Sequence, residues 1–110
     1  MTERITPEKA LAAVRASDDG LYGVLLEHGT MELGYYRPID SDEQAPHEQD
    51  EIYVIHTGSG VFIRGDERIA FAPGDVLFVP AGVDHRFVEF SDDFATWAIF
   101  WGPPGGEDPA

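Results

Sequence analysis

Eight short strand-like runs, each bounded by turn residues, fill the chain from residue 21 onward and constrain the fold more than any other feature. They lie near residues 21–27, 31–37, 52–56, 60–64, 67–72, 76–79, 85–90 and 95–101. Short strands of this number and spacing are typical of an all-β sandwich or barrel. Between the fourth and fifth runs, Gly65-Asp66 predicts a tight hairpin turn, because glycine supplies the positive φ that such turns need.

One helix is predicted, close to the N-terminus. Thr6 is a suitable N-cap, Pro7 suits the first helical position, and Glu8 places an acid in the first turn. Residues 9–16 are mostly good helix formers, and the polar run 17–20 ends the helix. No other part of the chain has a helical period.

The chain of 110 residues predicts one domain with one core. We expect residues 1–20 to form a helical segment that packs on a β barrel, and residues 21–101 to form that barrel. Residues 102–110 are rich in glycine and proline, and we expect a flexible tail that neither packs nor extends a sheet.

The formal net charge of −14 argues against nucleic-acid binding, which depends on lysine and arginine, and against docking on anionic membranes. The simplest consequence of this charge is solubility. The chain has no cysteine, which excludes disulfides, thiolate catalysis and zinc–thiolate sites. We find neither a secretory signal nor an apolar run of membrane-spanning length, and expect a soluble cytoplasmic protein.

Two separate glycine-punctuated segments carry the residues with metal-binding chemistry. His47 and Glu51 belong to the first segment, and His85 belongs to the second. Two imidazoles and a carboxylate, with coordination positions left open, suit a divalent transition metal. Each histidine alone is more often an ordinary surface residue, and Glu51 alone can be a solvated carboxylate. Because the two segments occur together, we favour metal binding by these three residues over ordinary surface positions.

The spacing of the first segment requires a bend. On one straight strand, His47 and Glu51 would lie roughly 13 Å apart, at about 3.3 Å per residue. Ligand bonds of about 2.0–2.2 Å would not let both side chains reach one ion. We therefore predict a polar reversal at residues 48–50, after which Glu51 opens a new strand.

The two segments resemble the motifs of the cupin family. The first cupin motif, HxH, three or four residues, E, six residues and G, is matched by His47, Glu51 and Gly58. The second motif, Gx5PxGx2Hx3N, is matched by Gly74, Pro80, Gly82 and His85, with Glu89 at the asparagine position. The match runs from about residue 45 to residue 89.

The resemblance implies a cupin double-stranded β-helix, a jelly-roll barrel with a metal inside its mouth. It implies that His47 and His85 coordinate the ion, and that Glu51 lowers the charge of the site and orients the open position. The ion would be divalent Fe, Mn, Zn or Ni. Ala45 stands where the first motif histidine belongs, and our hypothesis is that the amide oxygen of Gln44 fills this place.

Tyr53 lies two residues from Glu51 on the same predicted strand face. It is a candidate catalytic residue, either as a hydrogen-bond donor or as a general base, as in some lyases of the cupin superfamily. The alternative is an aromatic side chain that only lines the barrel. Phe87 shares a face with His85 and is predicted to line the substrate pocket.

Arg37 and Glu89 are also assigned to the substrate pocket. Arg37 and Arg86 are the basic residues close to the motifs, and either one can hold a substrate carboxylate or phosphate or form a structural ion pair. His28 and His56 match neither motif and are assigned to surface or turn positions.

Two functions fit these features. The first is a metalloenzyme of dioxygenase, isomerase or lyase type acting on a small organic molecule. The second is a non-catalytic module that binds a metal or metabolite, which the missing first histidine favours. The lack of a basic helix-turn-helix segment argues against a transcription regulator that acts alone, and the shortage of basic residues argues against a sugar-phosphate epimerase.

We expect a homodimer, because a small open jelly roll leaves edge strands and apolar surface uncovered. Trp97, Ile99 and Trp101 alternate along the last predicted strand. Their shared face is predicted to be buried, either in the core or at a dimer interface.

Overall fold

The computed structural model describes residues 4–42 and 44–108. The predicted helix is α1 (Pro7–Ala16). The eight predicted strands are confirmed, and no strand end differs from its prediction by more than two residues. They are β1 (Tyr22–His28), β2 (Met31–Tyr36), β3 (Asp50–Thr57), β4 (Gly60–Arg64), β5 (Glu67–Phe71), β6 (Val76–Val79), β7 (His85–Val88) and β8 (Ala95–Trp101).

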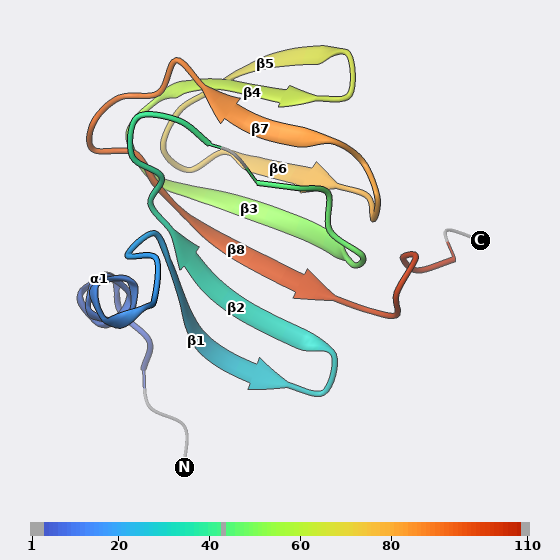
Figure 1. Cartoon of the computed structure of the whole chain (residues 1–110), viewed down its shortest axis with the longest axis horizontal. Helices are drawn as coiled ribbons and strands as arrows, with labels where there is room; N and C mark the ends of the chain where they lie inside the picture. The colour runs from blue at the N-terminus through green and yellow to red at the C-terminus, as the bar shows by residue number, and fades with distance from the viewer. Residues whose placement is uncertain (1–3, 43, 109–110) are drawn as a thin grey trace.

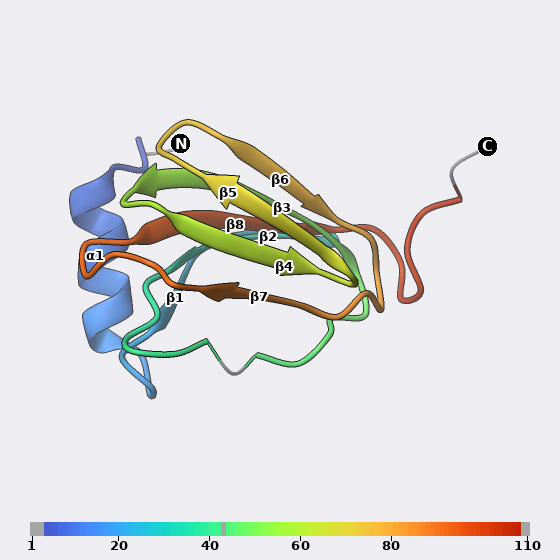
Figure 2. The same ribbon diagram turned by 90° about the horizontal axis from the view of Figure 1, so that it is seen from above.

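The strands form two antiparallel sheets, in the orders β1-β2-β8-β3-β6 and β5-β4-β7. The smaller sheet lies over the larger one (Figure 1), and α1 lies at one end of the pair (Figure 2). Among the described residues no ladder joins the sheets, so the jelly roll is a sandwich rather than a closed ring. The prediction of an all-β jelly roll with a short N-terminal helix is confirmed.

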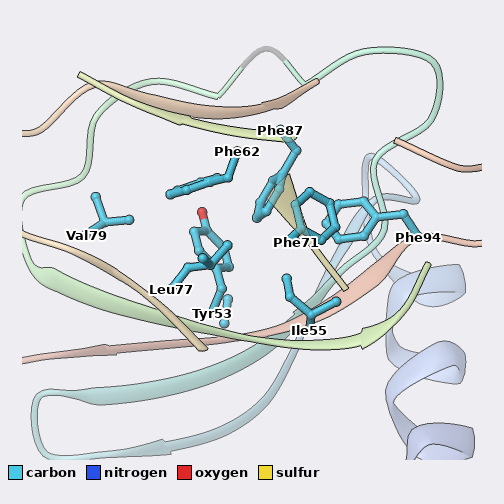
Figure 3. Close-up of a cluster of buried hydrophobic side chains, with 9 residues drawn as sticks. Tyr53, Ile55, Phe62, Phe71, Leu77, Val79, Phe87 and Phe94 are labelled. Atoms are coloured by element: carbon cyan, nitrogen blue, oxygen red, sulfur yellow. The ribbon is translucent and has the colours of Figure 1, made fainter. Parts of the chain in front are cut away.

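An aromatic-rich core fills the space between the two sheets (Figure 3). Alternation along β3 decides which residues enter it: Tyr53 and Ile55 point inward and are buried, whereas Val54 between them faces outward. Burying one large apolar side chain stabilises the fold by about 1.5–3 kcal/mol. The buried cluster comprises Tyr53, Ile55, Phe62, Phe71, Leu77, Val79, Phe87, Phe94 and Ala98.

The helix α1 covers part of the outer face of the larger sheet. The Thr6 side chain caps it by accepting a hydrogen bond from the backbone N–H of Lys9 at 3.2 Å. At Gly23 of β1, an added Cβ would lie 2.6 Å from backbone atoms of Ala13 and Val14, so only glycine permits this close approach. This helix does not approach the length needed to cross a membrane, and it is the only helix in the described ranges.

The segment after β8 is held against the sandwich as far as Glu107. The N–H of Gly105 donates to the carbonyl of Glu48 at 2.7 Å, and the N–H of Glu107 donates to Asp50 Oδ2 at 2.9 Å. The other Asp50 oxygen accepts from the N–H of Ala81 at 3.0 Å. The expectation that the tail packs against nothing is therefore wrong up to this point, because its backbone finds acceptors at Glu48, just before β3, and at Asp50, the first residue of β3.

Candidate metal centre

Three side chains from separate parts of the chain meet at one end of the sandwich. His47 comes from the loop before β3, Glu51 from β3, and His85 from the first position of β7. Glu51 Oε1 lies 3.3 Å from His85 Nε2 and 3.7 Å from His47 Nε2. One ligand atom from each residue lies within 4.8 Å of the other two. The chain bends at residues 48–49, as the sequence predicted.

The geometry and burial of this group fit a bound cation. Two ligands with bonds of about 2.0–2.2 Å to one ion lie roughly 3–3.5 Å apart, close to the observed separations. Both carboxylate oxygens of Glu51 are buried, and neither has a hydrogen-bond partner within the described part of the chain. A buried charge without partners is costly, so the carboxylate is suited to a positive ion.

The surroundings of His85 direct one ring nitrogen toward Glu51. Its Nδ1 lies 2.9 Å from the carbonyl oxygen of Val83, which can only accept, so Nδ1 carries a proton. With Nδ1 held by Val83, Nε2 is the nitrogen that would coordinate a metal in place of its own proton. Burial lowers the pKa of His85, but the contacts with Glu51 and Val83 outweigh burial and raise it overall. For His47, burial dominates and lowers the pKa.

Gln44 and Tyr53 border the same three side chains. Gln44 Oε1 lies 3.0 Å from His47 Nε2 and accepts a hydrogen bond from the Tyr53 hydroxyl at 3.0 Å. The Tyr53 hydroxyl also lies 3.1 Å from His85 Nε2. Burial, followed by the charge of Glu51, raises the pKa of Tyr53 well above its ordinary value. In this environment Tyr53 keeps its proton and acts as a hydrogen-bond donor.

Asp42 sets the orientation of Gln44. A carboxylate accepts hydrogen bonds and never donates them. Asp42 Oδ2 accepts from Gln44 Nε2 at 2.7 Å, so the amide oxygen of Gln44 must point the other way, toward His47. Asp42 also accepts from the Tyr36 hydroxyl at 2.6 Å and from the backbone N–H of Phe87 at 2.8 Å. This buried side chain therefore joins the loop to β2 and β7.

A cavity of about 440 Å³ leads to His47 and Glu51, two of the three side chains. This volume is within the range of small-molecule sites, about 300–1,000 Å³. Its wall combines aromatic rings with acidic and amide groups, and the Phe100 ring packs edge-on against His47 at 4.9 Å between centroids. The lining residues are Asp19, Leu21, Tyr22, Tyr36, Ile39, Ser41, Gln44, His47, Glu51, Tyr53, Ala98 and Phe100.

Sequence comparison identifies the family. The profile of the family described as Cupin domain matches residues 34–101, which is more than half of the chain. An uncharacterised protein from Streptomyces coelicolor is 39% identical over 97 residues, covering 86% of this chain and 90% of that protein. The chain belongs to the cupin family.

Two further comparisons bear on the fold and on the choice of function. A cupin 2 conserved barrel domain protein from Salinispora arenicola superposes with a TM-score of 0.67 at 24% identity, over 93% of this cupin and 89% of that chain. Acireductone dioxygenase from Leishmania infantum is 39% identical over 80 residues. That match spans 58% of this cupin but only 23% of the enzyme.

Three residues assigned to the substrate pocket lie outside the cavity. Phe87 belongs to the core, where its ring packs 4.8 Å from that of Tyr53. The positions after His85 alternate as predicted, but the inward direction at Phe87 leads into the sandwich interior. Arg37 is exposed just after β2. Glu89 is exposed and pairs with Arg68.

The assignment of His56 to a surface or turn position is wrong. This cupin places His56 in β3, half-buried, with Nδ1 2.6 Å from the Tyr35 hydroxyl. Val54 and His56 occupy the outer face of β3, and the helix cluster around Tyr35 covers part of that face. His28 is exposed at the end of β1, as expected.

Sequence reasoning missed Tyr22, Tyr36, Phe100 and Asp42. For Phe100 a signal existed: because Trp97, Ile99 and Trp101 share one face of β8, Ala98 and Phe100 must share the other, which lines the cavity. For the two tyrosines and Asp42 no spacing rule existed, because their places depend on how the loop after β2 folds back.

The first prediction concerns Asp42. Replacing it with alanine leaves the buried N–H of Phe87 without its acceptor and removes the partner of Gln44, and we expect a stability loss of about 2–3 kcal/mol. Tyr36→Phe removes one donor while Asp42 keeps its others, and we expect a loss of about 1 kcal/mol. Urea denaturation measures both values.

Asp92→Ala is the control, since Asp92 is exposed in a turn and its loss removes the same charge. If Asp42→Ala is no more destabilising than Asp92→Ala, Asp42 does not hold the loop in place.

Proposed function

We propose that this cupin is a metalloenzyme that acts on a small organic molecule. His47, Glu51 and His85 would hold a divalent transition metal: Fe, Mn, Zn or Ni. The observation that carries the proposal is Glu51, whose buried oxygens have no hydrogen-bond partner in the described residues and face two imidazole nitrogens at 3.3 and 3.7 Å. A divalent ion supplies the positive charge that this arrangement lacks.

Gln44 is proposed as an oxygen ligand that replaces the histidine missing at Ala45. Support comes from its amide oxygen, which Asp42 directs to within 3.0 Å of His47 Nε2. An amide oxygen is a neutral and weaker donor than an imidazole. The centre would therefore bind its ion less tightly than a site with a further histidine.

The chemistry would combine the ion with the side chains at the inner end of the cavity. A bound ion would act as a Lewis acid and polarise a substrate oxygen. Tyr53 would donate its proton to a substrate oxygen in place of Gln44 Oε1, which accepts it at 3.0 Å when no substrate is bound. The aromatic walls formed by Tyr22, Tyr36 and Phe100 would orient the substrate. Dioxygenase, isomerase and lyase reactions are all compatible with these roles.

The second candidate function is a non-catalytic module that binds a metal or metabolite. Ala45 favours it, because the site has one imidazole fewer than the family motif. The absence of a third histidine weakens retention of a redox-active ion, and the cavity would then serve to hold a ligand.

The second prediction tests the ligands. In protein purified without a metal-affinity tag, we expect near-stoichiometric metal, which is lost in both His47→Ala and His85→Ala because each removes an imidazole donor. Gln44→Ala should keep the metal with an affinity lowered by roughly tenfold. Elemental analysis and metal titration measure these effects.

His28→Ala is the matched control, because His28 is exposed and distant from the site along the chain. Its metal content should equal that of the parent protein. Full metal retention in the His47 and His85 variants would exclude the proposed centre, and an unchanged affinity in Gln44→Ala would exclude Gln44 as a ligand.

The third prediction separates enzyme from binding module. With iron loaded, oxygen uptake is expected in the presence of a suitable diol or catechol, and Tyr53→Phe should lower the turnover rate while metal content stays the same. Absence of turnover across metals and substrates, together with measurable ligand binding, would favour the binding module.

A homodimer is part of the proposal, because an uncharged apolar row crosses the outer face of the larger sheet. Strand register places its members side by side on all five strands: Leu26, Leu33, Ile99, Ile52 and Phe78. At one end of the row, the Phe78 side chain is 44% exposed. In a chain of charge −14, this face is where a second copy can approach without charge repulsion. The cytoplasmic location stays a prediction from the sequence.

The fourth prediction concerns this interface. Light scattering should give twice the 12.1 kDa mass of the chain, and Phe78→Glu should reduce it to one copy, because the new charge would be buried against the partner. Ala70→Glu adds the same charge to an exposed position on β5 and should leave the dimer intact. A monomeric parent protein would contradict the proposal.

A further inference from the structure

The cavity leading to the candidate metal centre lacks positive charge. All seven lysine and arginine residues fall within the described part of the chain, and none of them lines the cavity. Among the described residues two carboxylates do: Glu51 at the candidate metal centre and Asp19 from the loop between α1 and β1. A phosphate or carboxylate held beside Asp19, away from the proposed ion, would therefore meet negative charge with no lysine or arginine to compensate it.

Two tyrosines that line the cavity donate their hydroxyl protons to carboxylates of the protein. The Tyr22 hydroxyl donates to Glu32 Oε2 at 2.7 Å, and the Tyr36 hydroxyl donates to Asp42 Oδ1 at 2.6 Å. Burial, followed by these carboxylate contacts, raises the pKa of both tyrosines, so they stay protonated. Each hydroxyl can accept a hydrogen bond from a ligand, but it has no proton left to donate.

Asp19 is held in place with its charge retained. Its Oδ1 accepts from the backbone N–H groups of Leu21 at 2.8 Å and Tyr22 at 3.2 Å and lies 3.3 Å from the Ser17 hydroxyl. The N–H of Leu21, together with the other donors, lowers the pKa of Asp19. All three contacts use Oδ1, and the Asp19 side chain is exposed, so a ligand can reach it. The lining is thus rich in acceptors and carries a fixed carboxylate.

We propose that the cavity selects a cationic small molecule. Its ligand would place an oxygen donor at the metal centre and a protonated amine near Asp19. Phosphorylated and carboxylated analogues of the same shape would be rejected. This inference rests on the proposed function for the metal end and adds the charge requirement at the outer end.

The test uses three catechols that share the diol and differ in the charge of the side chain: dopamine, 4-methylcatechol and 3,4-dihydroxyphenylacetate. Zinc replaces iron so that the probes are not oxidised, and calorimetric titration under anaerobic conditions gives the dissociation constants. An exposed carboxylate is worth up to about fivefold for a cation and a similar factor against an anion. We expect dopamine to bind about tenfold more tightly than the carboxylate, with a smaller ratio at high salt.

Asp19→Asn isolates the source of the preference. Asparagine keeps the oxygen that caps Leu21 and Tyr22 but removes the charge, so the ratio of the two dissociation constants should fall below about threefold. Asp66→Asn, in the exposed turn between β4 and β5, changes the net charge equally and should keep the full ratio.

Metal binding is measured first, without any catechol. A protein that takes up none of zinc, iron, manganese and nickel refutes the proposed function and, with it, this inference. A zinc-loaded protein that binds the three probes equally, prefers the carboxylate or binds none of them refutes the cationic ligand alone. Equal ratios in Asp19→Asn and Asp66→Asn would also refute it, because the preference would then not come from Asp19.

Discussion

The buried carboxylate of Glu51 is the constraint on which the candidate site depends. β3 lies between β8 and β6, so an inward side chain on it cannot reach water through a sheet edge. A charge in that position is costly unless cationic partners surround it. His47 from a loop and His85 from the opposite sheet supply nitrogen atoms within 3.7 Å. The site therefore ties together three pieces of chain that no single secondary-structure element connects.

The loop after β2 differs from the family motif at the position of its first histidine. Ala45 provides no ligand, and the neighbouring Gln44 presents an amide oxygen to His47 because Asp42 occupies the other end of its amide group. Asp42 also accepts from Tyr36 and from the backbone of Phe87, so the same buried side chain anchors the loop and orients the candidate ligand. Loop position and site geometry thus depend on one carboxylate.

The strands of the larger sheet carry two separate surfaces. On β3, Glu51 and Tyr53 face the interior, whereas Ile52 faces outward in register with Ile99 and Phe78 on the neighbouring strands. Because strand side chains alternate strictly, a slip of one residue would exchange the candidate metal centre with the apolar outer face. The register of β3 between β6 and β8 therefore determines the position of both the candidate metal centre and the apolar outer face.

Turn residues and local pattern were enough to locate the helix, all eight strands and the bend after His47, because these depend on neighbours in the chain. The motif spacing also identified the three residues that meet. Sequence reasoning placed Phe87 in the substrate pocket instead of the core and did not identify Tyr36 and Asp42 as site residues. It also did not predict that the segment after β8 packs against the sandwich. Those features depend on contacts between residues distant in sequence, such as the hydrogen bond from the Phe87 N–H to Asp42. The sequence by itself determined which residues alternate and where the chain turns, since both are local properties of the backbone. Only the tertiary structure decided which inward side chains face the cavity and which face the core, because that depends on the strand or loop packed opposite.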